Sequence, residues 1–554
     1  MWRLIYLCLL FVRVYLALCP SYLHPDEIFQ GPEPIAGTIF PYPSHQTWEW
    51  TSSQPIRSVF PLWPIYGLPM TLLKWIWAQD EDGLVDPAVI YYTLRLVMFV
   101  LSFVLEDWAV HDLVRSPRNR RHAVLLVTSS YVTWTFQTHT FSNSVETLLV
   151  LWSLVVIERI VGENVTYYSG PAATKSFRAL YEHVRNAPVI TPLNNLLYNS
   201  QTGNLAQHGL HPHHQHLFVN LPQLLGPALI VLVFSAYPFN LRILKTMLSN
   251  ARLASAASGT LLLSIIPHQE PRFLLPTVPL LLSCIRVPTT RIWNRVFWIS
   301  WGIFNVILAV IMGVYHQGGV IPAQLAIPSL IVESINSTSS EAHNIEVFWW
   351  KTYPPPNFLL GPTISHPITN QTLNISTVPL MGYPQQELVF MLMQHMPTCD
   401  PSLIERLTTH YEPTDVYVVA PLSAWRLHDT YPPVSDFSFS VTFNQPPAQL
   451  NMHNIATFRQ HVNLDDMDFG DDGVRNTLAR VIGRRGLGVW AVHQACGAHE
   501  VVYVQDGVVI EREAGGQDKI AQSTASSSSP SQSGDGDVTT HVVPSTRETS
   551  VPGS

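Results

Sequence analysis

Long apolar stretches constrain the fold of this chain more than any other feature of its sequence. They lie near residues 4–19, 88–108, 123–139, 143–160, 217–237, 253–267, 271–286 and 296–315. Most of them approach the ~20 apolar residues that an α-helix needs to cross a bilayer. Charged residues make up 13% of the chain, whereas about a quarter is usual in a soluble protein. The sequence therefore predicts an α-helical polytopic membrane protein, with residues 1–315 as its multi-span domain.

Short basic loops orient these spans. Arginine and lysine gather in three of the connecting loops, over residues 115–121, 242–252 and 286–295. Because loops of this kind stay in the cytosol, loops 20–87 and 161–216 are predicted to be lumenal. Arg13 interrupts the first apolar stretch and no small-residue cleavage site follows it, which favours an uncleaved anchor over a signal peptide.

The number of predicted spans conflicts with the orientation of the loops. From a cytosolic N-terminus, the four spans up to residue 160 return the chain to the cytosol. Only one further span precedes the basic loop at 242–252, which must also be cytosolic. An odd number of crossings is therefore missing between 160 and 217, where no apolar run of about 20 residues exists. Either one span is misassigned or the chain is abridged at this point.

Residues 316–513 have a mixed composition with short β-like runs such as 416–420 and 501–504. Glycosylation sequons begin in this region at Asn336, Asn370 and Asn374. Three sequons in one segment favour a lumenal C-terminal domain, predicted to be mixed α/β. Cys399 and Cys496 are candidates for a disulfide if the domain is lumenal. Residues 514–554 are rich in Ser, Thr and Gly and are predicted to be disordered.

The first candidate site is His24-Pro25-Asp26-Glu27, directly after the first apolar stretch. Charged groups are costly at the end of a membrane segment and often mark function there. One interpretation is a helix start, with Pro25 in the first position and both carboxylates in the first turn. The other is a general base at the membrane boundary, because sugar transfer requires a carboxylate to accept the proton of the acceptor hydroxyl.

The second candidate site is His268-Gln269-Glu270-Pro271-Arg272-Phe273, between two predicted spans. The basic loops on either side place this segment in the lumen, on the side predicted for Asp26. Arg272 and His268 are suited to hold a phosphate, because guanidinium presents a planar fork of donors, and Glu270 can orient either group. The alternative is a structural Arg–Glu pair that ties two helix ends together.

Two further segments carry polar clusters. The loop that contains His211 and His216 is rich in histidine, but it holds no Cys or carboxylate and its spacing fits no closed zinc site. Contact with a substrate phosphate or sugar is favoured over metal binding. The acidic run 461–472 lacks the terminal glutamate of a calcium loop and is interpreted as a solvated turn.

Other functional classes find no support in the sequence. There is no P-loop, no GxSxG elbow and no CxxC pair. The net charge of −8 gives no support for nucleic-acid binding. A transporter would show inverted repeats and charges at the middle of its spans; here no such repeat is visible, and the charges gather at the ends of the spans.

The segments His24–Gln30, Thr140–Glu146 and His268–Phe273 together resemble glycosyltransferase family 22. Its members are multi-span mannosyltransferases of the endoplasmic reticulum with the GT-C fold. The stretches 190–199, 204–212, 316–319 and 461–470 resemble the members that add a fourth, α-1,2-linked mannose to the glycosylphosphatidylinositol (GPI) precursor. The resemblance extends over nearly the whole chain up to about residue 513.

The resemblance assigns roles to individual residues. It implies that Asp26 and the adjacent Glu27 are the catalytic carboxylates, with Asp26 in the family's acidic position. The implied substrate-binding residues, mainly on the donor side, are His24, His211, His216, His268, Glu270 and Arg272. The donor would be dolichyl-phosphate-mannose and the acceptor the GPI precursor, with inversion at the sugar and no metal or other cofactor. The enzyme would lie among the lipids of the endoplasmic reticulum membrane with a lumenal active site.

The chain departs from the family in one place. Relatives carry extra membrane segments, including an Asn-Arg-Pro-Thr-Phe-like motif, before the counterpart of Tyr167, and nothing comparable stands between Arg159 and Glu163. The count of spans fails at the same point. A shortened gene model, a splice form or a true deletion would each explain the difference. Within the family, the alternative function is another step: the third GPI mannose or a mannose of the N-glycan precursor.

Overall fold

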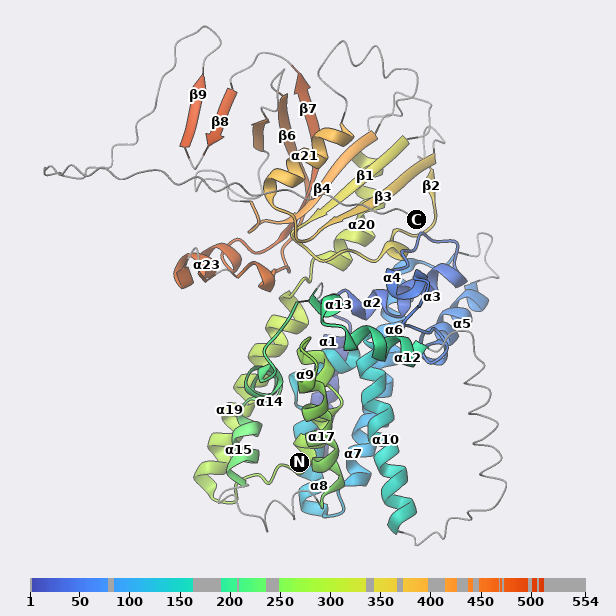
Figure 1. Ribbon diagram of the computed structural model, residues 1–554, viewed down its shortest axis with the longest axis vertical. Helices are drawn as coiled ribbons and strands as arrows, with labels where there is room; N and C mark the ends of the chain where they lie inside the picture. The colour runs from blue at the N-terminus through green and yellow to red at the C-terminus, as the bar shows by residue number, and fades with distance from the viewer. Residues whose placement is uncertain are drawn as a thin grey trace, which may run out of the picture. The chain divides into compact units, whose positions relative to one another are not determined.

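The chain forms two compact units, Met1–Cys496 and Gly497–Ser554, in a computed structural model (Figure 1). The structure describes residues 2–77, 84–162, 191–206, 209–235, 249–334, 343–365, 372–396, 414–425, 437–441, 448–467, 469–470, 473–496, 501–505 and 508–512. In the second unit, β8 (Val501–Gln505) and β9 (Val508–Arg512) form an antiparallel hairpin. The sequons at Asn336 and Asn370, together with Cys399 and the 514–554 tail, lie outside the described residues, whereas Asn374 is part of a described strand.

The first unit combines a layer of helices with a mixed β-sheet. Its helices are α1 (Trp2–Ala17), α2 (Asp26–Phe29), α3 (Pro32–Ile39), α4 (Trp48–Thr51), α5 (Leu68–Trp77), α6 (Pro87–Leu101), α7 (Asp107–Leu113), α8 (Pro117–Thr128), α9 (Tyr131–Trp134), α10 (Ser142–Gly162), α12 (Thr191–Ser200), α13 (Thr202–Ala206), α14 (Leu221–Leu225), α15 (Pro227–Ser235), α17 (Ala251–Ile265), α18 (Thr277–Cys284), α19 (Arg291–Val310), α20 (Val320–Ser334), α21 (Gln385–His395) and α23 (Gly473–Val481). Short 3₁₀ or π segments are η1 (Trp63–Gly67), η2 (Ser102–Glu106), η3 (Phe136–Thr138), η4 (His216–Asn220), η5 (Pro271–Leu274), η6 (Ile311–Tyr315), η7 (Asn357–Leu360) and η8 (Leu464–Asp466).

Two continuous helices are long and apolar enough to cross a membrane, Pro87–Leu113 and Arg291–Tyr315. Two bent pairs, Tyr131–Thr138 with Ser142–Ile160 and His216–Leu225 with Pro227–Ser235, also qualify if each is one span. Many of their large apolar side chains are exposed to the outside of the layer, as expected for helices solvated by lipid. The predicted membrane character is confirmed, while the predicted division into separate domains stays a prediction.

Local signals explain where two of the apolar helices begin. Pro87 opens α6 directly after Asp86, whose carboxylate accepts a hydrogen bond from the amide of Ala88 at 2.7 Å. Asn250 caps α17 in the same way, by accepting from the amide of Arg252 at 3.2 Å. Such caps satisfy amides that have no partner within the helix.

The sheet has seven strands in the order β2-β3-β1-β4-β7-β6-β5. The strands are β1 (His343–Trp350), β2 (Ile364–Ser365), β3 (Thr372–Leu380), β4 (Thr414–Pro421), β5 (Phe437–Val441), β6 (Ala448–Phe458) and β7 (Leu487–Cys496). β1 is parallel to β3 and β4, whereas the remaining pairs are antiparallel. The mixed α/β character predicted for this region is confirmed, and its position in the lumen remains a prediction.

The loop between α1 and α6 joins the sheet region to the helices. Glu33 of α3 is fully buried, and its Oε1 atom accepts the amides of His45 at 2.9 Å and Asn357 at 3.1 Å. The hydroxyl of Tyr22 donates to the carbonyl of Pro354 at 3.2 Å. Because a buried carboxylate and a buried hydroxyl both need partners, these contacts fix the segment after β1 against the N-terminal loop.

Candidate active site

The short helix α2 places Asp26 at the end of the helical layer that faces the sheet. A helix does start here, with Pro25 as its N-cap rather than its first residue and with Asp26 in its first turn. The functional interpretation of Asp26 stays a prediction. The amide of Asp26 donates to Nδ1 of His24 at 3.2 Å, and the same ring nitrogen lies 3.4 Å from Oδ1 of Asp26. The residue pair therefore forms a local turn that presents the carboxylate outward.

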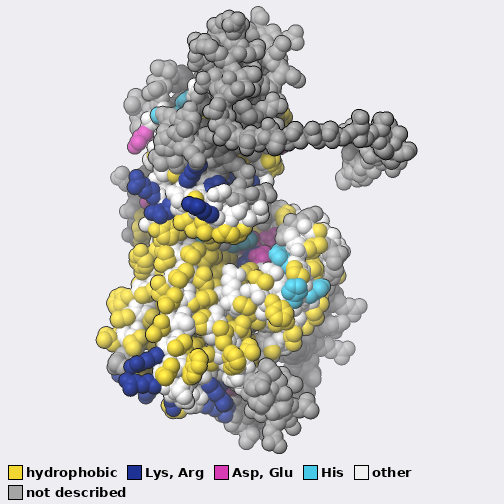
Figure 2. Space-filling view, turned by 90° about the vertical axis from the view of Figure 1, so that its left-hand side faces the viewer, with side chains coloured by type: hydrophobic (Ala, Val, Ile, Leu, Met, Phe, Trp, Pro, Cys, Tyr) yellow, Lys and Arg dark blue, Asp and Glu magenta, His cyan; other side chains and the backbone are white. Residues whose placement is uncertain are grey.

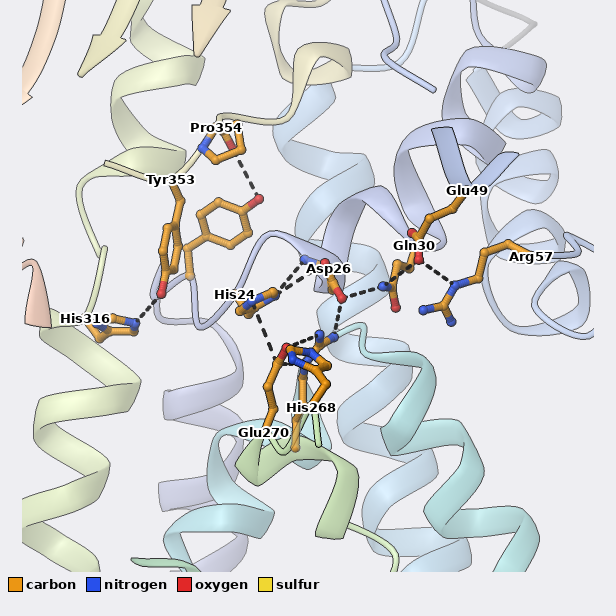
Figure 3. Close-up of polar contacts among 12 residues, drawn as sticks. His24, Asp26, Gln30, Glu49, Arg57, His268, Glu270, His316, Tyr353 and Pro354 are labelled. Carbon is orange, nitrogen blue, oxygen red and sulfur yellow. Dashed lines mark hydrogen bonds and ion pairs between the residues drawn. The ribbon is translucent and has the colours of Figure 1, made fainter. Parts of the chain in front are cut away.

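Arg272 lies between two carboxylates, those of Asp26 and Glu270, which are 246 and 2 residues before it in the chain. Its Nη1 atom is 2.5 Å from Oδ2 of Asp26. Its Nε atom donates to Oε2 of Glu270, and its Nη2 atom donates to Oε1 at 3.1 Å. The Arg272 side chain is 8% exposed, and those of Asp26 and Glu270 are 23% and 19% exposed. The guanidinium is thus sheltered by protein, and the cluster opens to the outside on the carboxylate side. Figure 3 shows how His24, Asp26, His268 and Glu270 gather in this cluster.

The electrostatics of the cluster follow from this geometry. Burial acts to raise the pKa of Asp26, but Arg272 and His24 outweigh it and hold that pKa well below its usual range. Burial also acts to raise the pKa of Glu270, and the hydrogen bond from His268 together with Arg272 again lowers it. Both groups are therefore carboxylates at neutral pH, bound to a shared cation.

His268 completes this side of the cluster. Its Nε2 atom lies 2.8 Å from Oε1 of Glu270, and its Nδ1 atom lies 3.1 Å from the carbonyl of Gly209. The hydrogen bond to Glu270 raises the pKa of His268. His24 approaches the same carboxylate, with its Nε2 atom 3.9 Å from Oε2. Two imidazoles and one guanidinium, groups that can bind an anion, thus gather around the Glu270 carboxylate.

Glu27 points away from this cluster. Its side chain is 1% exposed, and its Oε2 atom lies 2.6 Å from Nδ1 of His139. The hydroxyl of Thr140 donates to the Glu27 carbonyl at 2.7 Å. Burial raises the pKa of Glu27 to about 8. A protonated carboxyl enclosed by protein has no access to substrate here, so the geometry gives Glu27 a structural place rather than the catalytic one predicted for it.

His211 and His216 support the cluster from behind. The Nδ1 atom of His211 accepts the amide of Gln269 at 3.3 Å, and the ring lies 5.9 Å from that of His268. The amide of His216 donates to the side chain of Gln269 at 2.9 Å, and its buried ring contacts Asn220. Both histidines thus position the loop that carries Glu270. Among the described residues, these contacts join the two histidines to this loop and to Asn220, and not to the carboxylates of Asp26 and Glu270.

The structure adds residues that the sequence did not single out. Gln30, one turn after Asp26, donates to Oδ2 of that carboxylate and lies 3.5 Å from Oε1 of Glu49. Arg57 pairs with Glu49 at 3.2 Å. Only the spacing of Gln30 along a helix from Asp26 would have pointed to it, because neighbours on a helix are three or four residues apart.

The segments after α19 and β1 close the other side of the opening. The ring of Tyr353 lies 6.0 Å from that of His24, and its hydroxyl is 3.5 Å from Nε2 of His316. Gln317 bonds the Asn463 side chain at 3.0 Å, so the run predicted as a solvated acidic turn has a buried beginning at the junction with the helices. Asp465 and Asp466 follow at its more exposed end.

The cluster lies at the edge of the apolar belt formed by the helices. Figure 2 shows acidic and histidine side chains together at the upper border of this belt. Among the described residues, no group of three or more His, Cys, Asp or Glu side chains is arranged to hold a metal ion. The geometry therefore brings two ionised carboxylates, one guanidinium and two imidazoles together at this border.

A model of the Alg9-like mannosyltransferases, glycosyltransferase family 22, matches residues 4–181 and 178–360. The chain belongs to this family. Its relatives include the GPI mannosyltransferases 4 of Aspergillus oryzae and Emericella nidulans, each 47% identical, with 89% and 88% of this chain and 99% and 98% of the relative covered. The Saccharomyces cerevisiae enzyme of the same name is 33% identical over 63% of this chain and 75% of its own length. No solved structure matches the chain.

The comparison with relatives also shows that this chain is shorter than a relative in the region they share. The match with the Aspergillus oryzae relative runs over 564 residues, although 89% of this 554-residue chain is only about 490. On the order of 70 aligned positions of that GT-C type relative thus have no counterpart in this chain. The two stretches that match the family model meet at 178–181, close to the point where the count of spans fails.

Proposed function

We propose that this mannosyltransferase moves a mannose from dolichyl-phosphate-mannose to the third mannose of a GPI precursor, in α-1,2 linkage. The names of its relatives support the step, and the pairing of Asp26 with Arg272 at 2.5 Å is the observation that carries the chemistry. That pairing joins a candidate base and a candidate phosphate ligand that are far apart in the sequence.

In the proposed reaction, Asp26 accepts the proton of the acceptor 2-hydroxyl as that oxygen attacks the anomeric carbon of the donor. The bond from the anomeric carbon to the phosphate oxygen breaks, and dolichyl phosphate leaves with its negative charge. An α-linked product from a β-linked phosphate donor requires inversion, so one direct displacement suffices and no glycosyl-enzyme forms.

Arg272, His268 and His24 meet the charge of the leaving phosphate. Stabilisation of charge that develops in the transition state is commonly a large part of catalysis. Glu270 holds both Arg272 and His268, with contacts of 3.1 Å and 2.8 Å, and so fixes the cradle in place. His211 and His216 fix the loop that carries Glu270.

The donor phosphate also bears on the basicity of Asp26. In the free protein, Arg272 holds the pKa of Asp26 low, which makes this carboxylate a weak base. A donor phosphate that binds Arg272 competes with Asp26 for the guanidinium, and the pKa of Asp26 then rises. The base thus gains strength when the donor is in place.

The proposed location follows from the substrates and the basic loops. Both substrates are lipid-borne, and an opening at the bilayer edge allows them to enter sideways from the membrane. The loops over 115–121 and 286–295 carry the cytosolic signal, so the proposed site faces the lumen of the endoplasmic reticulum. No cofactor is required for this direct displacement.

A transfer assay with graded acceptors tests the proposal. The purified full chain receives dolichyl-phosphate-mannose and GPI precursors that carry two, three or four mannoses. The expected result is one added mannose on the three-mannose precursor only, removable by an α-1,2-mannosidase. Transfer to the two-mannose precursor, or to an N-glycan precursor instead, would move the enzyme to another step. Absence of transfer to every acceptor would refute the proposed function for this chain.

A further inference from the structure

The helix α23 exposes an apolar edge that the helical packing does not cover. Val474, Leu478 and Ile482 follow one another at intervals of four residues and are 61%, 39% and 46% exposed. Val481, which lies about 60° around the helix from Leu478, is buried against the domain at 1% exposure. Phe469, just before the helix, is 48% exposed. Val474 and Leu478 on the helix and Ile482 in the turn directly after it form an apolar stripe that favours an apolar surrounding.

The depth of α23 relative to the membrane follows from α19. The continuous helix Arg291–Tyr315 has 25 residues, which at ~1.5 Å per residue is roughly 37 Å long. The hydrocarbon core of a bilayer is only about 30 Å thick. With Arg291 in one headgroup layer, Tyr315 therefore reaches the other, where tyrosine is common.

Arg485 connects α23 to that level. Its guanidinium carbon lies 5.9 Å from the centre of the Tyr315 ring. The turn after α23, which contains both Ile482 and Arg485, is therefore at the depth of the lipid headgroups. Figure 2 shows a band of Lys and Arg side chains directly above the apolar belt on this face.

A hollow beside this turn has the chemistry of a headgroup site. It has a volume of about 450 Å³ and is lined by Leu422, Thr457, Arg459, Ile482, Gly483 and Arg485. Arg459 and Arg485 are both exposed. Arg480 is turned inward, because it donates to the carbonyl of Asp466 at 2.9 Å and lies 3.9 Å from the carboxylate of that residue.

We propose that α23 lies on the bilayer surface as a membrane-contact element of the sheet region. Leu478 and Ile482 enter the upper acyl region, and Arg459 and Arg485 hold the phosphate of a phospholipid. The bilayer is the occupant because the stripe continues the apolar belt of α19, and because anionic headgroups complement the arginines. This contact goes beyond the transfer reaction and fixes the height of the sheet region above the membrane.

Photocrosslinking in a defined bilayer tests the proposal. p-Benzoylphenylalanine replaces Leu478 or Ile482 in the full chain, reconstituted in nanodiscs of phosphatidylcholine and phosphatidylinositol in equal parts. Asn476 is the control, because it is exposed on the same helix and points about 160° away from Leu478. Lipid adducts are expected at Leu478 and Ile482 with a yield about tenfold above that at Asn476. Equal yields at all three positions, or no lipid adduct at all, would overturn the proposal.

The arginine site has its own test. The double variant Arg459→Gln and Arg485→Gln should lower, by about tenfold, the phosphatidylinositol that remains bound in native mass spectrometry. The charge-conserving pair Arg459→Lys and Arg485→Lys should retain most of it. Only variants whose melting temperature equals that of the unchanged protein are compared, so that unfolding is not mistaken for lost lipid binding. Unchanged lipid retention in the glutamine pair would refute the headgroup site.

Discussion

Replacement of a carboxylate by the amide of the same size should abolish transfer at Asp26 but leave it nearly unchanged at the adjacent Glu27. Asp26→Asn removes the ionised group that faces the opening and touches Arg272. Glu27→Gln replaces a buried carboxyl whose pKa of about 8 leaves it mostly protonated at neutral pH. Both changes retain size and shape, so any difference between them reports the environment of the two side chains.

The structure sets the expected magnitudes. Loss of a general base lowers transfer by roughly 10²–10⁴-fold. In Asp26→Asn, Arg272 keeps Glu270 as partner, so the stability loss is that of one charged hydrogen bond, about 1.5–3 kcal/mol. In Glu27→Gln, the new amide can still donate to His139. The cost is then at most about 1 kcal/mol, and transfer stays within roughly threefold of the unchanged protein.

Initial rates of transfer to the three-mannose precursor, measured with melting temperatures of the same preparations, decide the matter. Asp26→Asn should melt normally within a few degrees and show almost no transfer. Glu27→Gln should be nearly indistinguishable from the unchanged protein in both measurements. Transfer above a tenth of the normal rate in Asp26→Asn, or its loss in a well-folded Glu27→Gln protein, would refute the assignment of the base.

Two further changes test the charged pairs. Because Asp26 and Glu270 have lowered pKa values in the folded protein, their stabilisation is complete above the unfolded values near 4 and is lost as the pH falls below them. The melting temperature, measured as a function of pH, should therefore fall in acid. The Arg272→Gln variant should show a smaller fall in acid, and its free energy of unfolding at neutral pH should be lower by about 3–5 kcal/mol. The same pH dependence in this variant as in the unchanged protein would contradict the pairing. Asp107→Asn removes the negative charge that lies 3.1 Å from the buried Arg13, and it should lower the free energy of unfolding by a similar ~3–5 kcal/mol. The double variant Arg13→Met and Asp107→Leu should regain most of this stability. Equal losses of stability in the single and the double variant would argue against this explanation.

Apolar length predicted part of the membrane helices, and the short β-like runs predicted the sheet region. The stretches 88–108 and 296–315 correspond to the two continuous helices. The stretch 271–286 became the eight-residue α18 after a 3₁₀ turn, because its side chains are buried among other helices and need no lipid contact. Periodicity and hydropathy do not report whether an apolar residue faces protein or lipid.

The candidate site could be predicted only in part. The chemistry of Asp26 and Arg272 is visible in the sequence, and the structure brings the two together. The difference between Asp26 and Glu27 is not visible, because it depends on which side of α2 faces the buried His139. Tyr353 belongs to a loop whose place beside His24 depends on tertiary packing alone.

The two ends of α10 and the start of α12 show where a membrane crossing is missing. α10 begins beside the site, where Tyr66 binds the carbonyl of Thr140 at 3.0 Å. Its 21 residues cover about 31 Å, and Arg159 near its end pairs with Asp112 at 2.8 Å, close to the basic loop. α12 resumes at the opposite end, where the ring of Tyr198 lies 4.8 Å from that of Trp48.

α10 thus ends and α12 begins at opposite ends of the helical layer, yet the sequence between them contains no apolar run that could cross a bilayer. About 70 aligned positions of the Aspergillus oryzae relative have no counterpart in this chain, and that many residues would suffice for a few membrane segments. Reading the transcript across codons 155–170 is expected to reveal additional in-frame sequence with an odd number of apolar runs. A transcript that passes unchanged through these codons, from cells in which the enzyme is active, would contradict the count and require one of the other segments to lie differently in the membrane.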